Sequence, residues 1–281
     1  MPAHTHSMLY GEQMADASEE GPILVFLGPT LRIAEAEAVL DAIYLQPAAQ
    51  GDILLAAHAF RPRAMILIDG QFEDRPAVRH KEILWAMAQG ILMVGAASMG
   101  ALRAAELSDF GMIGVGLIYR WYRRWALSSP RDVCGSPPAL TPDDAVAVHS
   151  GPAELGFMQL TDSLVDLQRT FSVLMRSKII TPAERALLTT MARNMNFRER
   201  TLATIVGAAG WPDGRVQELR QTMVSQKRQD ALLALGAAPS LVRRARTAGG
   251  GDSWMATNTF MRDLEAGGID SKLVNTYKFN P

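Results

Sequence analysis

The sequence contains very little cysteine, because Cys134 is the only one. A single thiol forms neither an internal disulfide nor a cysteine-rich zinc site, so the chain is expected to be cytoplasmic. It also lacks any apolar run close to the roughly 20 residues that a membrane-spanning helix needs. Residues 1–20 contain no apolar stretch of the signal-peptide kind and are expected to form a mobile leader.

The sequence also lacks an excess of charge of either sign. Its 28 Lys and Arg residues face 29 Asp and Glu residues, which gives a formal net charge of -1. A protein that binds nucleic acid through phosphate neutralisation needs a basic surface, so the balance argues against a nucleic-acid partner. The hydrophobic fraction of 48% is typical of a globular chain with a substantial core.

The sequence does contain three short apolar runs. Each run ends in a turn and is followed by a helical pattern. Runs of this kind predict parallel strands joined by right-handed helical crossovers. The fold class expected is therefore α/β, a small parallel sheet of three βα units followed by a mostly helical C-terminal part. The expected strands are 23–27, 64–68 and 91–95, and the expected helices around them are 31–44, 51–60, 77–89 and 98–107.

The domain organisation follows from the same pattern. Residues 1–20 form the leader, 21–130 the α/β core, 131–160 a loop and helix that complete the core, and 161–281 the helical C-terminal part. Glycines predict an irregular loop over 110–116, and a strand or helix rich in aromatic residues and arginine follows at 118–125.

The stretch from Gly95 to Arg103 is the most informative, because a predicted strand passes there directly into a predicted helix with Ser98 at the junction. Backbone N–H groups and the positive end of the helix dipole converge at such a junction, which suits a serine nucleophile beside an oxyanion site. The alternative is that Ser98 is an ordinary helix N-cap.

A second cluster of candidate residues, His80-Lys81-Glu82, begins the helix before the third strand. Successive helix positions point about 100° apart, so the three side chains cannot all face one pocket. His80 or Lys81 could serve as a general base that Asp69, at the end of the second strand, would orient. The alternative is that Lys81 and Glu82 are solvated residues of a first helical turn.

The remaining candidates carry less information. Arg120, Arg123 and Arg124 alternate with aromatic residues such as Trp121, which predicts a basic face for docking a protein or, alternatively, arginines at the edge of an aromatic core. His149 is a ligand or base candidate, although an isolated histidine is usually structural. The sequence predicts no metal site and, without a Walker lysine after Gly28-Pro29-Thr30, no nucleotide or other cofactor.

Several of these strings together resemble the TfuA-like protein family. They are Val25-Phe26-Leu27-Gly28-Pro29-Thr30-Leu31, Gln50-Gly51-Asp52, Ile68-Asp69-Gly70-Gln71-Phe72, Val78-Arg79-His80-Lys81-Glu82-Ile83-Leu84, and Gly95 to Leu107. The likeness spans about residues 21–169, in the order and spacing of the family. Arg79 departs from it, since an aromatic residue is expected there.

The resemblance implies an accessory protein of ribosomally made, modified peptides. Its expected partners are a YcaO enzyme, a ThiS-like thiocarboxylated sulfur carrier and a precursor peptide. In the scheme that the resemblance implies, YcaO activates a backbone amide with ATP, and the TfuA-like protein is expected to supply sulfide by hydrolysing the carrier thiocarboxylate. Because Cys134 lies outside the matched strings and has no second cysteine to resolve a persulfide, sulfur is not expected to pass through it.

In this scheme Ser98 attacks the thiocarboxylate, Lys81 or His80 moves the proton, and Asp69 orients the base. The residues expected to form the oxyanion site or to position substrate are Met99, Gly100, Arg103, Thr30 and Glu82. Two alternatives stay open. Water could attack while Ser98 donates a hydrogen bond, or the protein could be a non-catalytic adaptor that docks YcaO and the carrier.

Overall fold

The described part of the chain is built on one parallel β-sheet. The computed structural model describes residues 21–71, 75–127, 143–212, 214–245 and 254–275, so the expected leader at 1–20 and Cys134 lie outside the described residues. The sheet has the order β2-β1-β3-β4-β5. Its strands are β1 (Ile23–Phe26), β2 (Ile43–Leu45), β3 (Ala64–Leu67), β4 (Leu92–Ala96) and β5 (Ile113–Val115).

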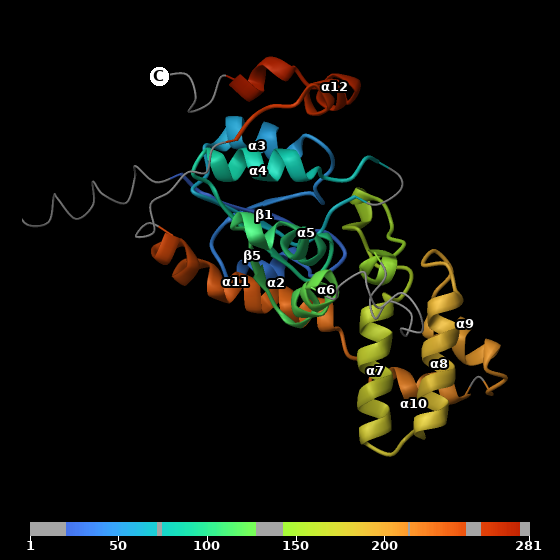
Figure 1. Ribbon diagram of the computed structural model, residues 1–281. Coiled ribbons are helices and arrows are strands. Elements are labelled where there is room, and N and C mark those ends of the chain that lie inside the picture. The colour runs from blue at the N-terminus through green and yellow to red at the C-terminus, as the bar shows by residue number, and fades with distance from the viewer. Residues whose placement is uncertain (1–20, 72–74, 128–142, 213, 246–253, 276–281) are drawn as a thin grey trace, which may run out of the picture.

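Helices cover both faces of this sheet, and a helical part projects from it (Figure 1). Short 3₁₀ helices lie at 143–146 and 271–275. The helices are α2 (Ile33–Glu37), α3 (Asp52–Phe60), α4 (His80–Ala88), α5 (Met99–Leu107), α6 (Leu117–Leu127), α7 (Leu164–Arg176), α8 (Pro182–Asn194), α9 (Leu202–Ala208), α10 (Gly214–Arg220), α11 (Gln226–Ala245) and α12 (Asn258–Ala266).

Two apolar layers arise because alternate strand residues point to opposite faces of the sheet. Leu24 and Phe26 of β1 pack in the layer that includes α3, α4 and α5. Val25, between them, packs in the other layer with residues of α2 and α11. The central strands β1 and β3 are buried at every position, which is why their sequences are continuous apolar runs.

The helix α11 links the helical part to the sheet. Its residues Ala231, Ala234, Leu235 and Ala238 form a stripe of mostly small side chains that packs on the sheet layer opposite α3 and α4. Small residues at this spacing allow the helix to approach the strands closely. The helical part is therefore joined to the α/β core through its own last long helix (Figure 1).

The predicted α/β class with a parallel sheet and a helical C-terminal part is confirmed. Two edge strands were not predicted. β2 overlaps the end of the expected helix 31–44 and extends one residue past it, and three residues are too few to show a strand period. β5 lies within the expected loop 110–116, and its Gly114 carries no side chain because a Cβ there would lie 2.1 Å from the Tyr119 ring.

A close approach between α5 and β3 makes a first prediction. A Cβ on Gly100 would lie 1.7 Å from the Leu67 carbonyl oxygen, so Gly100→Ala should lower the free energy of unfolding by about 2 kcal/mol or more. The control is Gly207→Ala in α9, where an added Cβ meets nothing within 4 Å and the change should be neutral or mildly stabilising. Urea unfolding of both variants measures this, and equal stabilities would contradict it.

Candidate functional site

A pocket lies at the carboxyl edge of the sheet, where the strand order reverses. β2 lies on one side of β1 and β3 on the other, and ligands of open α/β sheets bind at such switch points. Pro29 follows β1, Asp69 follows β3 and Ser98 follows β4, and all three line the pocket. Its volume of about 80 Å³ is far below the ~300–1,000 Å³ of pockets that enclose a drug-sized ligand.

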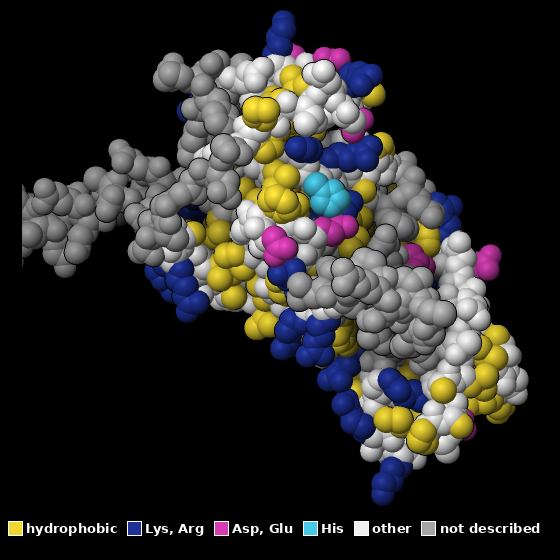
Figure 2. Space-filling view, in the orientation of Figure 1, with side chains coloured by type: hydrophobic (Ala, Val, Ile, Leu, Met, Phe, Trp, Pro, Cys, Tyr) yellow, Lys and Arg dark blue, Asp and Glu magenta, His cyan; other side chains and the backbone are white. Residues whose placement is uncertain are grey.

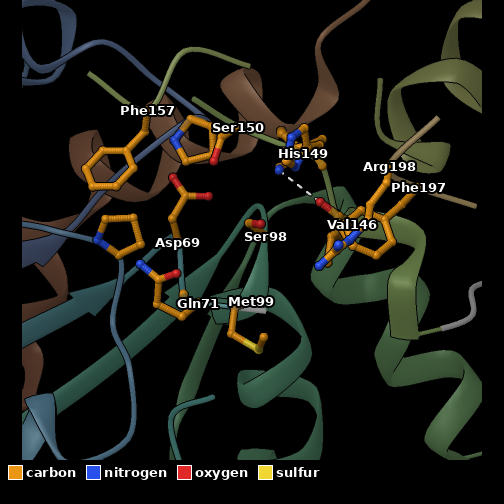
Figure 3. A pocket seen from close by; sticks show the side chains of 16 residues that line it. Asp69, Gln71, Ser98, Met99, Val146, His149, Ser150, Phe157, Phe197 and Arg198 are labelled. Atoms are coloured by element: carbon orange, nitrogen blue, oxygen red, sulfur yellow. Dashed lines mark hydrogen bonds between the residues drawn. The ribbon is translucent and has the colours of Figure 1, made fainter. Parts of the chain in front are cut away.

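The opposite wall of the pocket comes from the part of the chain that follows the α/β core. It consists of residues 146–150, Phe157, the pair Phe197 and Arg198, and Lys227. Figure 3 shows Ser98 near the middle of the view, with Asp69 and Gln71 on one side and Phe197 and Arg198 on the other. The two parts of the chain therefore enclose one site.

Arg200 fixes the position of this wall. Its side chain is fully buried, and its guanidinium donates to the carbonyl oxygens of Asp144 at 3.0 Å, Ala147 at 3.4 Å and Asp162 at 3.2 Å. Burial lowers the pKa of Arg200, and the nearby Asp144 carboxylate opposes that effect. The residues before His149 are thus held against the start of α9.

Ser98 is placed by a strained turn between β4 and α5. The preceding residue, Ala97, has a φ of 63°, which is unusual for a residue with a side chain and recurs at functional sites. Ser98 occupies the N-cap position of α5, but its side chain makes no capping hydrogen bond. Only 8% of the residue is exposed, and the exposed part faces the pocket. A capping role therefore does not account for the serine.

One backbone amide next to Ser98, that of Met99, makes no hydrogen bond to another of the described residues. The Ser98 amide donates to Ala96 at 2.7 Å and the Gly100 amide to Ile68 at 3.2 Å. Among the bonds of the described residues, the Met99 amide has no acceptor, and Met99 lines the pocket. Of these two expected oxyanion residues, Met99 has an amide that faces no protein acceptor among the described residues, whereas the Gly100 amide already donates to the Ile68 carbonyl.

Asp69 holds the turn after β1. Its carboxylate accepts hydrogen bonds from the Gly28 amide at 2.9 Å, the Thr30 amide at 3.2 Å and the Thr30 hydroxyl at 2.6 Å. Asp69 is 2% exposed, so these bonds compensate for the removal of the carboxylate from water. Thr30 is therefore bound to Asp69 and keeps the two strand ends together.

Lys227, which the sequence analysis did not single out, lies in the same pocket. It is 1% exposed, near the start of α11. Its ammonium donates to the Val146 carbonyl at 3.0 Å. Burial lowers its pKa, while the charges of Asp69 and Asp166 act in the opposite direction. The signal in the sequence was its helical spacing from Ala231 and Ala234, which placed it on the buried stripe.

The family comparison covers many of the residues that line the pocket. Residues 69–201 match the family model described as TfuA-like protein. Over these residues the chain is similar to the TfuA-like family. No curated protein matches the chain. The TfuA-like match includes Asp69, Ser98 and most of the opposite wall, and it ends before Lys227. At the level of the family, this similarity supports an accessory role in thioamidation and association with a YcaO-type enzyme.

Two predicted residues of the TfuA-like region, His80 and Lys81, are not among those that line the pocket. His80 Nε2 lies 2.7 Å from a carboxylate oxygen of Glu106, which also accepts from Arg103 at 2.6 Å. Glu106 comes eight residues after Ser98, or ~12 Å along α5. His80 and Arg103 therefore belong to a surface cluster that joins α4 to α5.

Glu82 lies neither in the pocket lining nor on the surface. It is fully buried and accepts hydrogen bonds from the backbone amides of Arg79 at 2.7 Å, Gly51 at 2.9 Å and Ile53 at 3.3 Å. These bonds tie the start of α4 to the start of α3. Burial raises the pKa of Glu82 to about 7, against the lowering effect of the three amides.

The predicted docking residues lie on α6. Arg123 pairs with Asp109 at 2.8 Å, the Arg120 side chain donates to the Gly116 carbonyl, and Arg124 is exposed. Trp121 is half-buried and packs against the core. The helix thus turns aromatic residues inward and arginine outward.

Among the described residues, no three His, Cys, Asp or Glu side chains are grouped so that they could hold a metal ion. In the same part of the chain, no helix has the length and apolar character to cross a bilayer.

The buried carboxyl of Glu82 makes a pH prediction. The pKa of Glu82 is about 7 in the folded protein and 4.5 for an ordinary glutamate, the value taken for the unfolded chain. As pH rises, the unfolded chain therefore loses the Glu82 proton before the folded protein does. Folding stability should then fall between pH 4.5 and 7, by about 3 kcal/mol at most. Glu82→Gln removes this titration, so its stability should fall less than that of the wild type over the same interval.

Urea unfolding at pH 5 and pH 7.5 measures the difference. The matched control is Glu199→Gln, which changes an exposed glutamate and should keep the wild-type pH dependence. An identical loss of stability in the wild type and Glu82→Gln would contradict the prediction.

Proposed function

We propose that this TfuA-like protein hydrolyses the C-terminal thiocarboxylate of a small ThiS-like carrier and so supplies sulfide to its YcaO partner. The observation that carries the proposal is Ser98. It is a serine without a capping bond, at the start of the nine-residue helix α5, in a pocket at the switch point of the sheet. That placement gives a nucleophile beside an anion-stabilising helix end.

The size and charge of the pocket favour this substrate class. A cavity of about 80 Å³ accepts the end of a polypeptide tail more readily than a whole cofactor. A thiocarboxylate is anionic, and attack on its carbon adds electron density that must be stabilised. Lys227 and Arg198 line the same space, the free Met99 amide lies beside Ser98, and the carboxylate of Asp69 is occupied by the Gly28–Thr30 turn.

The reaction follows in two steps. The Ser98 hydroxyl oxygen bonds to the thiocarboxylate carbon, the carbon–sulfur bond breaks, and the serine proton leaves with sulfur as HS⁻. Water then attacks the resulting ester, which releases the carrier carboxylate and restores the serine hydroxyl. Both steps pass through an oxyanion that the Met99 amide and the end of α5 would stabilise. If water attacked directly, no ester would form.

Replacing the nucleophile tests the proposal. Ser98→Ala should reduce sulfide release from thiocarboxylated carrier by at least about 1,000-fold, because nucleophile removal costs most of the rate in serine hydrolases. The matched control, Ser150→Ala, removes another hydroxyl of the pocket lining and should retain release within a few-fold. Sulfide is measured with carrier and the TfuA-like protein alone, without YcaO.

Release at the wild-type rate by Ser98→Ala would overturn the nucleophile. Mass spectrometry of the stopped reaction separates the covalent and direct-water routes, because only the first adds the carrier to Ser98.

A second function, as an adaptor for YcaO, is favoured by the distribution of charge. Residues 164–245 hold 13 Lys and Arg against 6 Asp and Glu, a formal charge of +7, whereas residues 1–163 hold 11 against 19. Figure 2 shows Lys and Arg side chains following one another from the region of α6 down the helical part. Such a surface would attract an acidic face of a partner.

The adaptor role predicts a salt-sensitive complex. Arg124→Glu on α6 should weaken co-elution with YcaO several-fold at low salt, because it reverses an exposed charge at the edge of the basic surface. Arg262→Glu on α12 makes the same charge change at a distant, exposed position and serves as the control. Binding is compared at 50 and 500 mM salt. Equal binding by both variants would argue against the basic surface, and stimulation of YcaO without any sulfide release would favour a pure adaptor.

A further inference from the structure

We propose that residues 150–160, here called the rim hairpin, form the surface on which the folded body of the carrier docks. The inference rests on the proposed function, because it names what holds the carrier while its tail reaches Ser98. His149, Ser150 and Phe157 line the pocket, so the rim hairpin is continuous with it. A protein whose C-terminal tail enters the pocket must therefore lie against this rim.

Backbone hydrogen bonds hold the rim hairpin in a defined conformation. The Gly151 amide donates to the Met158 carbonyl at 2.8 Å, and the Leu160 amide donates to the His149 carbonyl at 2.9 Å. A surface that is ordered before binding loses little conformational entropy when a partner docks on it. The side chains of the rim hairpin are thus presented to a partner at low entropic cost.

The tip of the rim hairpin is apolar and exposed. The exposed fraction is 61% for Leu155, 56% for Met158 and 47% for Leu160. Phe157 has a φ of 55°, which is uncommon for a residue with a side chain, and it lines the pocket on the side of Asp69 (Figure 3). The backbone thus directs one aromatic ring to the pocket and leaves three apolar side chains in solvent. Exposed apolar side chains that lie together indicate an interaction site.

Charge favours the carrier over YcaO as the molecule that covers the rim hairpin. Glu154 is the only charged residue of the rim hairpin, whereas residues 164–245 carry a formal charge of +7. An acidic face that is attracted to residues 164–245 gains no attraction from the rim hairpin. The carrier has an anionic tail, and the adjoining pocket is lined by Arg198 and Lys227. The basic pocket fits the tail of the carrier, and the apolar rim fits a face of its folded body.

The small size of the pocket makes a second contact necessary. A volume of about 80 Å³ takes up only the end of a tail, and so small a contact binds weakly because association has a large entropic cost. Burial of Leu155 and Met158 against an apolar face of the carrier would supply the additional affinity. We therefore expect the rim hairpin to set the affinity for the carrier without touching the reacting atoms.

Binding of the carrier in its carboxylate form tests the docking surface without any reaction. Leu155→Ala and Met158→Ala should each weaken binding, measured by fluorescence anisotropy of labelled carrier, by about 10-fold or more, because each removes a large apolar side chain from the contact. The matched controls are Leu233→Ala and Met255→Ala. They shorten side chains of the same types, 57% and 80% exposed, away from the pocket lining and should bind like the wild type.

Two substrates separate loss of docking from damage to the pocket. With the whole thiocarboxylated carrier, Leu155→Ala and Met158→Ala should raise KM for sulfide release by about 10-fold and leave kcat unchanged. With a synthetic thiocarboxylated peptide of the carrier tail, which lacks the folded body, both variants should equal the wild type. Equal rates on the peptide also show that the variants are folded.

A photo-crosslinker identifies the molecule that covers the rim hairpin. Protein with p-benzoylphenylalanine in place of Met158 should crosslink to the carrier in a mixture that also contains YcaO, whereas the same replacement of Met255 should not. Crosslinks from position 158 to YcaO or to a second copy of this chain would overturn the inference. Wild-type binding by both Leu155→Ala and Met158→Ala would do the same.

Failure of the docking surface and failure of the hydrolysis give different results. If the rim hairpin does not bind the carrier, sulfide release that depends on Ser98 still supports the hydrolysis. If the carrier binds through the rim hairpin but sulfide release does not depend on Ser98, the docking surface stands and the proposed nucleophile does not.

Discussion

The burial of one lysine is the constraint on which the arrangement of this protein depends. The charges of Asp69 and Asp166 both act on Lys227, which donates a hydrogen bond to the Val146 carbonyl. An isolated ammonium would be too costly to bury, so β3, α7, α11 and the segment before His149 must meet around it. Removing either carboxylate would leave the lysine with less compensation than the fold provides. The sheet and the helical part are therefore held together by charge interactions around Lys227 as well as by apolar packing.

The same requirement explains why the pocket is small and polar. Asp69 compensates Lys227 while it accepts three hydrogen bonds from Gly28 and Thr30, which holds the end of β1 against the end of β3. A Cβ at Gly70 would lie 2.7 Å from a side-chain carbon of Met99, so the turn after β3 also presses against the start of α5. Three strand ends are thereby packed around Ser98. On the proposed chemistry, the sheet supplies the nucleophile and the amide, and the helical part supplies the charge that balances them.

The sequence predicted the features of the site that are local and missed those that depend on distant contacts. Apolar runs ending in a polar turn were enough to place Asp69 and Ser98 at one edge of a parallel sheet, because parallel strands share their carboxyl edge. The His80-Lys81 pair was attractive by proximity in the sequence, but α4 directs His80 to Glu106 on the side of α5. Lys227 could be found only by noticing that a charged residue continues the buried stripe of α11. β2 and β5 were too short to show a period, and their pairing is visible only in the assembled sheet.

These contacts also bear on what the helical part does. If it only docked a partner, the α/β core would form the site alone, and the helices could be exchanged for others of similar charge. Yet residues 146–150, Phe197, Arg198 and Lys227 contribute to one wall of the pocket, and the buried Arg200 side chain fixes that wall through hydrogen bonds to three carbonyl oxygens. Part of this wall lies beyond the residues that match the family. The segment 164–245, which carries the +7 charge, thus also contributes Phe197, Arg198 and Lys227 to the pocket wall. On the proposed function, docking and hydrolysis share a single structural element and cannot be assigned to separate halves of the chain.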